Sequence, residues 1–381
     1  MELLVLVPDD PDHAGRQTVM VKRMASDTVV YHSSVPCSSG TVLPSGQTPN
    51  TLRFQFFIMS NLNVALLAPP DYARDLGKKG TTSDITFYNL KKGDATVTFI
   101  EPTRYPEKLS SLFYAISLSD RVILVVSEMN AAFGECVLML QCAGKSDGCL
   151  ILKNYISPDQ IAPLIKGTVL EHYEVIDEDM VGLREKMLGI AVKQTAHQKT
   201  HDSTGKGVVP VDTHFNVKGV GVVVLGSVAQ GMIRKHETLK VLPTEKTAQI
   251  RSIQKHDDDA ETAVAGDRVG LALKNIEAED LDRGFVLTSD PSIRSATTVT
   301  GKAQLVKYWP APLKEGMVLY AGHWMQFLPT RLEKAVVDGD WRMPLLTLTM
   351  EKALVFPPHA RIVLHYLEGG KLRVVGSMVI E

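Results

Sequence analysis

Gly77, Lys78, Lys79 and Gly80 form the run whose residue types come nearest to a phosphate-binding loop. Such a loop follows a buried strand and reads G-x-x-x-x-G-K-[ST], because its backbone N–H groups and its lysine surround the phosphates while the hydroxyl holds Mg²⁺. The run lacks both the four-residue spacing and a hydroxyl residue directly after the lysine. We therefore interpret residues 77–80 as a solvated turn.

Composition limits the classes of protein that fit. With 381 residues, 44% apolar and 22% charged, the chain is long enough for two or three globular domains. The formal net charge of -2 excludes binding to nucleic acid through bulk charge, so an RNA contact must use a local basic patch. No apolar run reaches membrane-spanning length. The cysteines have no C-x-x-C spacing, which favours reduced thiols in a cytoplasmic protein and no metal site; they are Cys37, Cys136, Cys142 and Cys149.

Residues 59–205 alternate strand-like and helix-like segments. The apolar runs are typical of strands buried on both faces, and two stretches between them have helical spacing. This alternation predicts an α/β domain with a parallel sheet and helices on both sides. The polar segment 194–207 is interpreted as an interdomain linker. The predicted strands are 64–67, 96–100, 122–126 and 149–152, and the predicted helices are 106–117 and 134–142.

The pieces 206–292 and 293–381 have short apolar runs at a spacing of about ten residues, broken by Gly, Pro and Asp. Short strands with frequent turns favour closed barrels, because a closed barrel has no open edge. The predicted strands are 220–225, 238–242, 248–253, 269–273, 286–288, 345–350, 361–366 and 371–375.

Residues 1–58 have weak periodicity and a middle rich in Ser, Thr, Pro and Gly. The segment is either an additional interaction module or the product of a mis-assigned start codon. Met59 opens a short polar lead into the first buried run, as a normal protein start does. The choice between Met1 and Met59 stays open.

The glycine-studded third piece carries a recognisable pattern. Residues 211–226 read VDTHFNVKGVGVVVLG, and RSIQKHD at 251–257 and AGDRVGLALK at 265–274 follow in order. This pattern resembles the second domain of the EF-Tu/SelB class of translation elongation factors, most closely the archaeal SelB-like group. The resemblance extends to residues 76–89 and, more loosely, to the last piece. It implies a P-loop-like α/β domain, here a degenerate G domain at 59–205, followed by two all-β barrel domains at 206–292 and 293–381.

The family's nucleotide-binding motifs fall on unsuitable residues in this chain. Pro69 and Pro70 lack the N–H donors that a phosphate cradle uses. Arg104 stands where the family has a glycine, and Ile156 stands where an aspartate would accept hydrogen bonds from guanine. We therefore expect a nucleotide site that no longer binds or hydrolyses GTP, and no cofactor. The positions concerned are Ala68, Pro69, Pro70, Asp71, Glu101, Arg104, Tyr105, Lys153, Asn154 and Ile156.

In this family the second domain holds the aminoacyl end of tRNA. Phe215 is then either a stacking partner of the terminal adenine or a core aromatic, and Arg268 is either a phosphate contact or a surface ion pair. The pocket candidates are Asp212, His214, Phe215, Gln254, His256, Asp257 and Arg268.

The family's third domain binds the tRNA arm, and the last piece is the only one with more basic than acidic residues. Its candidate phosphate contacts are Lys302, Lys307, Lys314, Arg331, Lys334 and Arg342. Trp309, Trp324 and Trp341 lie among them in the sequence and are expected in the core.

Three functions fit these observations. The first is a cytoplasmic, non-enzymatic elongation-factor-like protein that binds tRNA or the ribosome through its barrels, without membrane or DNA partners. The second is a GTP-dependent factor for a specialised aminoacyl-tRNA, which would bind GTP and Mg²⁺ at an unrecognised phosphate site. The third is a protein-binding regulator on the same scaffold. The tRNA, the amino acid and the oligomeric state are left open by the sequence.

Overall fold

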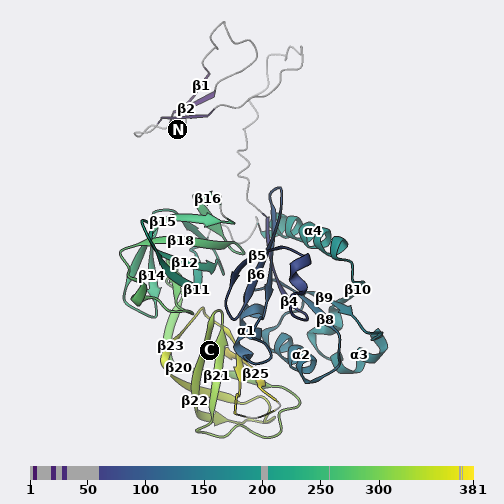
Figure 1. Ribbon diagram of the computed structural model, residues 1–381. Coiled ribbons are helices and arrows are strands. Elements are labelled where there is room, and N and C mark those ends of the chain that lie inside the picture. The colour runs from purple at the N-terminus through teal and green to yellow at the C-terminus, as the bar shows by residue number, and fades with distance from the viewer. Residues whose placement is uncertain are drawn as a thin grey trace, which may run out of the picture. The chain divides into compact units, whose positions relative to one another are not determined.

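The computed structural model describes residues 3–6, 19–22, 28–31, 60–198, 205–256, 258–368, 370 and 372–381 (Figure 1). The chain divides into two compact units, Met1–Phe56 and Phe57–Glu381. In the first unit, β1 (Leu3–Leu6), β2 (Val19–Lys22) and β3 (Thr28–Tyr31) form an antiparallel three-stranded sheet. Met59 lies outside the described residues, and both explanations of residues 1–58 stay predictions.

The second unit begins with a seven-stranded sheet in the order β10-β9-β8-β4-β7-β6-β5. The four predicted apolar runs lie in β4, β7, β8 and β9, which pair in parallel. The expectation of a wholly parallel sheet is wrong at one edge, where β5, β6 and β7 are antiparallel because a tight turn at Gly93 joins β6 to β7. The strands are β4 (Ser60–Leu67), β5 (Lys78–Thr82), β6 (Thr86–Lys92), β7 (Ala95–Glu101), β8 (Arg121–Val126), β9 (Gly148–Leu152) and β10 (Glu174–Ile176).

Helices cover both faces of this sheet. Alternate residues of each buried strand point to opposite faces, so Leu67 and Leu124 pack with α1 (Leu109–Ser117) and α2 (Ala131–Ala143). Leu66 and Ile123 pack on the other face with α4 (Met180–Gln198). The structure also contains α3 (Pro158–Ile165), η1 (Tyr72–Asp75) and η2 (Val169–His172). No helix within the described residues is long and apolar enough to cross a membrane.

The predicted linker at 194–207 is partly wrong. α4 continues to Gln198, so the first residues of that segment are helical. Residues 199–204 lie outside the described part of the chain. The first barrel's first strand, β11 (Val208–Val217), begins directly after the predicted linker.

The strands that follow form the first barrel. Its ring closes because β14 pairs with both β19 and β15. Gly226 is required in β12, since a Cβ there would lie 2.5 Å from the Pro210 carbonyl oxygen. With β11, the elements are β12 (Gly221–Ser227), β13 (Met232–Arg234), β14 (Thr238–Leu242), β15 (Thr247–Lys255), β16 (Asp258–Ala260), β17 (Thr262–Val264), β18 (Arg268–Lys274), η3 (Ala278–Asp280) and β19 (Val286–Thr288).

The last six strands form a second closed barrel in the order β20-β23-β22-β21-β24-β25. The tryptophans pack against apolar clusters as expected; Trp309 is buried, whereas Trp324 and Trp341 are partly buried. The strands are β20 (Arg294–Leu305), β21 (Val318–His323), β22 (Gln326–Val336), β23 (Leu345–Phe356), β24 (Arg361–His365) and β25 (Val374–Ile380). The predicted fold class, an α/β domain followed by two all-β barrel domains, is confirmed, and each barrel is closed by six strands.

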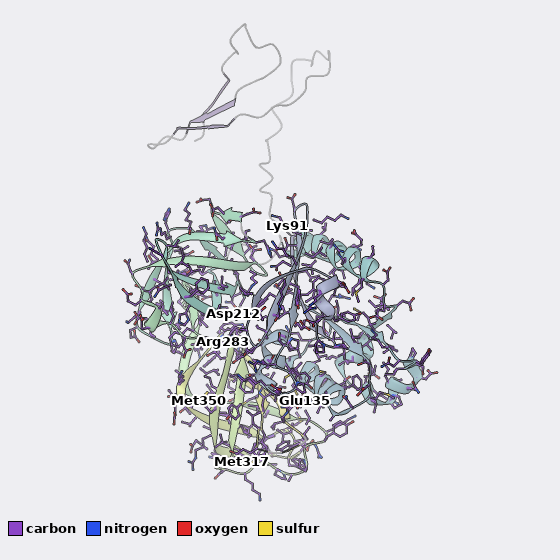
Figure 2. The ribbon with its side chains drawn as sticks, in the orientation of Figure 1. Lys91, Glu135, Asp212, Arg283, Met317 and Met350 are labelled. Atoms are coloured by element: carbon purple, nitrogen blue, oxygen red, sulfur yellow. The ribbon has the colours of Figure 1, made fainter. Side chains whose placement is uncertain are left out.

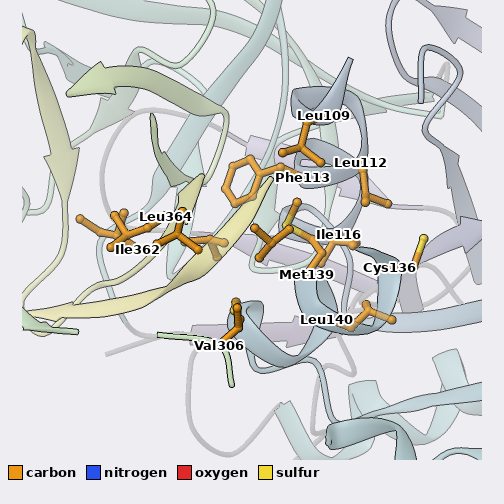
Figure 3. Packing of buried hydrophobic residues seen from close by; sticks show 14 of the residues in the cluster. Leu109, Leu112, Phe113, Ile116, Cys136, Met139, Leu140, Val306, Ile362 and Leu364 are labelled. Atoms are coloured by element: carbon orange, nitrogen blue, oxygen red, sulfur yellow. The ribbon is translucent and has the colours of Figure 1, made fainter. Parts of the chain in front are cut away.

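The α/β domain and the C-terminal barrel share one buried apolar cluster. Figure 3 shows α1 and α2 facing barrel residues such as Ile362 and Leu364. The Phe113 ring of α1 lies 5.4 Å from the His365 ring and 5.9 Å from the Phe327 ring. A Cβ on Gly322 would lie 2.7 Å from Cζ of Phe113, so glycine makes room for this ring.

Candidate nucleotide site and RNA-binding surfaces

A cavity of about 460 Å³ lies where β4, β7 and β8 end, which is the edge where α/β sheets bind their ligands. Its floor is apolar, with Leu124 and Phe133 among its lining residues. The predicted nucleotide positions divide into two groups. Ala68, Pro69, Pro70, Asp71, Glu101 and Tyr105 line this cavity, whereas Arg104, Lys153, Asn154 and Ile156 do not.

The loop after β4 leads into a single 3₁₀ turn, η1, and then into β5. Asp71 has a left-handed backbone with φ of 67°, and its N–H donates to Oε1 of Glu101 at 3.0 Å. The Asp71 carboxylate forms a 2.8 Å ion pair with Arg74. Pro69 and Pro70 have no N–H to offer. The loop therefore presents carboxylates and prolines where a phosphate cradle presents backbone donors.

Glu101 ties this loop to the end of β7. Its side chain is buried, and burial raises the pKa of Glu101. Hydrogen bonds from the Asp71 N–H and the Tyr88 hydroxyl partly offset that rise in pKa. A buried carboxylate at this position repels a phosphate group more strongly than an exposed one would, because the local dielectric constant is low.

Arg104 and Tyr105 leave β7 in different directions. The Arg104 guanidinium is exposed and lies 4.0 Å from Glu107, while its backbone N–H donates to the Asp84 carbonyl at 3.1 Å. The Tyr105 hydroxyl donates to the Ala132 carbonyl at 3.0 Å, and burial raises its pKa. Tyr105 therefore links β7 to α2.

The residues at the guanine-reading position have structural contacts. Lys153 pairs with Glu178 at 2.8 Å, and the Asn154 amide donates to the Ser127 carbonyl at 3.0 Å. Ile156 packs against the main apolar cluster. This arrangement offers no carboxylate to a guanine edge at residue 156.

Asp212 and Arg268, predicted as pocket residues, are buried between the α/β domain and the first barrel. Arg268 pairs with Asp212 at 2.8 Å, and its guanidinium stacks 3.5 Å from the centre of the Phe87 ring. Arg283 donates to both carboxylate oxygens of Asp84 at 2.8 Å and to the Asp212 carbonyl at 2.9 Å. Figure 2 shows Asp212 and Arg283 adjacent at this junction. Arg268 thus forms an ion pair, as one of its two interpretations expected, but the pair is largely buried and not at the surface. Asp84 and Arg283 were not among the predicted site residues.

The other pocket candidates lie on different parts of the first barrel. Phe215 is 43% exposed on β11, so the core interpretation of this ring is wrong. His214 has a buried Nδ1 without a hydrogen-bond partner among the described residues. Gln254 donates to Asp259 at 3.2 Å and lines a cleft together with His256. Asp257 lies outside the described residues.

This cleft has a volume of about 710 Å³ and separates the α/β domain from the first barrel. Six basic side chains and one carboxylate line it, and we call it the basic cleft. Residues 77–80 belong here, and the solvated-turn interpretation is wrong because Lys78, Lys79 and Gly80 lie in the exposed edge strand β5. The charged lining residues are Arg74, Asp75, Lys78, Lys79, Lys91, Arg184 and Arg268.

The predicted tRNA-arm residues of the last barrel separate into two groups. Lys302, Arg331 and Lys334 are exposed on the outer face of β20 and β22, on either side of β23. Lys307 and Arg342 line a different cavity, of about 590 Å³, between α2 and the barrel. Lys314 lies in the loop before β21 and belongs to neither group.

Comparison with known proteins identifies the family. Residues 221–288 match the family Elongation factor Tu domain 2. An uncharacterized protein of Methanocaldococcus jannaschii is 39% identical over 232 residues, which cover 61% of this chain and 73% of the relative. The selenocysteine-specific elongation factor of the same organism is 26% identical over 281 residues. The chain belongs to the EF-Tu/SelB class of translation elongation factors.

The fold agrees with this family. The crystal structure of SelB from Methanococcus maripaludis with the GTP analogue GppNHp superposes with a TM-score of 0.68 at 20% identity, covering 85% of this chain and 79% of SelB. The match to the selenocysteine-specific factor of M. jannaschii involves 65% of this chain. It covers 57% of the length of that factor.

Proposed function

We propose that this elongation-factor-like protein acts in the cytoplasm, binds tRNA or the ribosome through its two barrels, and does so without hydrolysing GTP. The hydrogen bond from the Asp71 N–H to Glu101 supports the absence of GTP hydrolysis. It occupies a backbone donor in the loop where phosphates would bind. Ile156 supports it independently, since its side chain belongs to the apolar cluster.

The observation that carries RNA binding is the outer face of β20, β23 and β22. Thr300 pairs with Thr347 across the strands, and their hydroxyls lie 3.1 Å apart. Lys334 lies opposite Thr347 on the other side of β23. Lys302 is two residues from Thr300 and therefore on the same face.

This arrangement suits a nucleic-acid backbone. Thr298 and Arg331 both pair with Thr349, which repeats the pattern of hydroxyls beside a cation one step along the sheet. Hydroxyls and cations of this kind contact phosphate and ribose oxygens without reading sequence. Arg331 is also 3.7 Å from Glu333, so we assign the stronger phosphate contacts to Lys302 and Lys334. We name this surface the threonine–lysine face.

The test is binding of fluorescently labelled tRNA at increasing salt concentration. We expect the logarithm of the association constant to fall linearly with the logarithm of salt, and the double variant K302E/K334E to bind at least about tenfold more weakly with a shallower slope. K166E/K193E changes two exposed lysines, one at the end of α3 and one on α4, by the same total charge and serves as the matched control. A salt slope near zero would overturn the proposal and favour a protein-binding regulator.

The GTP-dependent factor is the second candidate, because a cavity of about 460 Å³ persists at the sheet edge. Titration with fluorescent GTP and Mg²⁺ separates the two functions. Saturable, Mg²⁺-dependent binding at micromolar concentration would support this candidate and contradict the proposed loss of the nucleotide site.

A further inference from the structure

The cavity of about 460 Å³ at the carboxyl edge of the sheet has a charge balance that does not suit an anion. Asp71, Glu101 and Glu128 bring three carboxylates to it, and Lys79 is the single cation among the described residues that line it. Asp71 is already compensated, because it pairs with Arg74 at 2.8 Å. A cavity with excess negative charge repels anionic ligands and attracts cationic ones.

Glu101 is the deepest of the three carboxylates, with only 6% of the residue exposed. Two neutral donors reach it, the Asp71 N–H at 3.0 Å and the Tyr88 hydroxyl. No ion pair joins it to a cation within the part of the chain that the structure describes. A carboxylate accepts about four hydrogen bonds, so Glu101 keeps acceptor capacity for a ligand. A cation bound beside it would stabilise a buried charge that is hydrogen-bonded but not neutralised.

The rest of the wall suits an apolar body. Phe133 and Tyr105 contribute aromatic rings, and Leu112 and Leu124 contribute aliphatic side chains. Four prolines, which have no N–H to offer an anion, also line the cavity: Pro69, Pro70, Pro102 and Pro106. Apolar and aromatic walls with few polar groups are typical of small-molecule pockets, and an ammonium group is attracted to the faces of aromatic rings.

The N-terminus of α2 also lies at this cavity, and a helix N-terminus attracts anions. Here that end is already capped, because the Asn130 side chain accepts a hydrogen bond from the Phe133 N–H at 3.1 Å. The Asn130 amide in turn donates to the Glu128 carboxylate at 3.0 Å. The helix end is therefore supplied with a negative charge from the chain itself, and it does not reverse the preference for a cation.

We propose that this cavity binds a small organic cation, an amine or guanidine with an apolar body. Its charged group pairs with Glu101, and its body lies against Phe133 and the prolines. A volume of about 460 Å³ lies within the usual range for ligand pockets, about 300–1,000 Å³. The inference does not rest on tRNA binding. It goes beyond the proposed loss of GTP hydrolysis, because it assigns the cavity a ligand of opposite charge.

The experiment titrates the full chain with phenethylamine and with tryptamine by ligand-observed NMR. Each amine is compared with its alcohol, 2-phenylethanol or tryptophol, which has the same apolar body without the charge. The acid 3-phenylpropionate carries the opposite charge on a similar body. We expect at least one amine to bind saturably and its alcohol to bind at least about tenfold more weakly. We expect no binding of 3-phenylpropionate.

Variants locate the bound amine. E101Q keeps the size and an acceptor oxygen of the side chain, and we expect it to weaken the amine at least about tenfold while the alcohol changes by less than about twofold. E107Q makes the same substitution at an exposed carboxylate outside the cavity and should change nothing.

A132F tests the cavity independently of Glu101. It places a larger side chain in the cavity from the first turn of α2, so it should weaken the amine and the alcohol alike. Far-ultraviolet circular dichroism and thermal melting verify that each variant is folded. If E101Q does not fold, A132F and the comparison of amine, alcohol and acid still decide the question.

Several results would overturn the inference. They are the absence of saturable binding by both amines, equal affinity for amine and alcohol, wild-type affinity in E101Q, and equal weakening by E107Q. Displacement of the bound amine by GTP with Mg²⁺ would also overturn it, since the cavity would then accept an anion. None of these titrations involves the threonine–lysine face, so the proposed RNA binding is decided separately by its own salt titration.

Discussion

Arg283 joins two acidic residues from different domains. Asp84 belongs to the α/β domain and Asp212 to the first barrel, and their side chains are 14% and 3% exposed. Removing one partner of a buried ion pair leaves an uncompensated charge, which costs about 3–5 kcal/mol. We expect R283A to lose about this much free energy of unfolding in urea titrations at pH 7. The exposed R234A should lose less than about 0.5 kcal/mol, and a similarly small loss for R283A would contradict the assignment.

The same contact predicts a dependence on pH. Burial alone would raise the pKa of Asp84, but the hydrogen bond and charge of Arg283 outweigh it and hold the pKa below its usual value. A carboxyl group whose pKa is lower in the folded chain than in the unfolded chain stabilises the fold. This stabilisation is complete above the pKa of the unfolded chain, about 3.9, and is lost as the pH falls through the pKa of the folded chain. The difference in unfolding free energy between wild type and R283A should therefore be largest near neutral pH and narrow below about pH 4. A constant difference from pH 7 to pH 3 would contradict this account.

At the scale of elements, α1 is fixed to the C-terminal barrel. Gly322 leaves no room for a side chain beside Phe113, so we expect G322A to cost about 1–3 kcal/mol through overpacking. F113A should cost about 3–5 kcal/mol because it opens a cavity in the shared cluster. The double variant should cost less than the sum, since the smaller residue 113 relieves the clash. Additive losses in denaturant titrations would show that the two residues do not touch.

His365 lies at the same contact between α1 and the barrel. Burial lowers the pKa of His365 to about 3, although its hydrogen bond to the Tyr320 carbonyl acts in the opposite direction. Below the histidine pKa of the unfolded chain, about 6.5, the unfolded chain binds a proton that the folded chain does not. The free energy of unfolding therefore falls by about 1.4 kcal/mol for each unit by which the pH is lowered. We expect H365Q to flatten the pH dependence of stability between pH 6 and 4 by about that slope. An unchanged slope would mean that His365 titrates normally.

Apolar runs predicted β4, β7, β8 and β9 because burial on both faces leaves a continuous apolar signal in one short segment. β5 was missed because Lys78, Lys79 and Gly80 carry neither a two-residue period nor an apolar face. The core interpretation of Phe215 was wrong because an alternating strand pattern does not show which face of the strand packs against the rest of the protein.

The contacts between domains could not be predicted at all. Arg283 and Asp84 are far apart in sequence, and helical spacing in α1 does not distinguish Phe113 from residues packed on the sheet. The candidate nucleotide residues were located by resemblance, and their individual hydrogen bonds came only from the structure.

At the scale of the whole molecule, the elongation-factor architecture persists although the loop after β4 is short and tied to Glu101. A ligand that binds only the folded state raises the melting temperature in proportion to its affinity and concentration. We therefore expect GTP or GDP at millimolar concentration with Mg²⁺ to shift the melting temperature of the full chain by less than about 1 °C. A larger shift would contradict the proposed loss of the nucleotide site.

The most direct test compares the affinity of labelled tRNA for the full chain in buffer without nucleotide and in buffer with GTP and Mg²⁺. The account predicts saturable, salt-sensitive binding without nucleotide that GTP does not strengthen. Binding that occurs only when GTP and Mg²⁺ are present would contradict it.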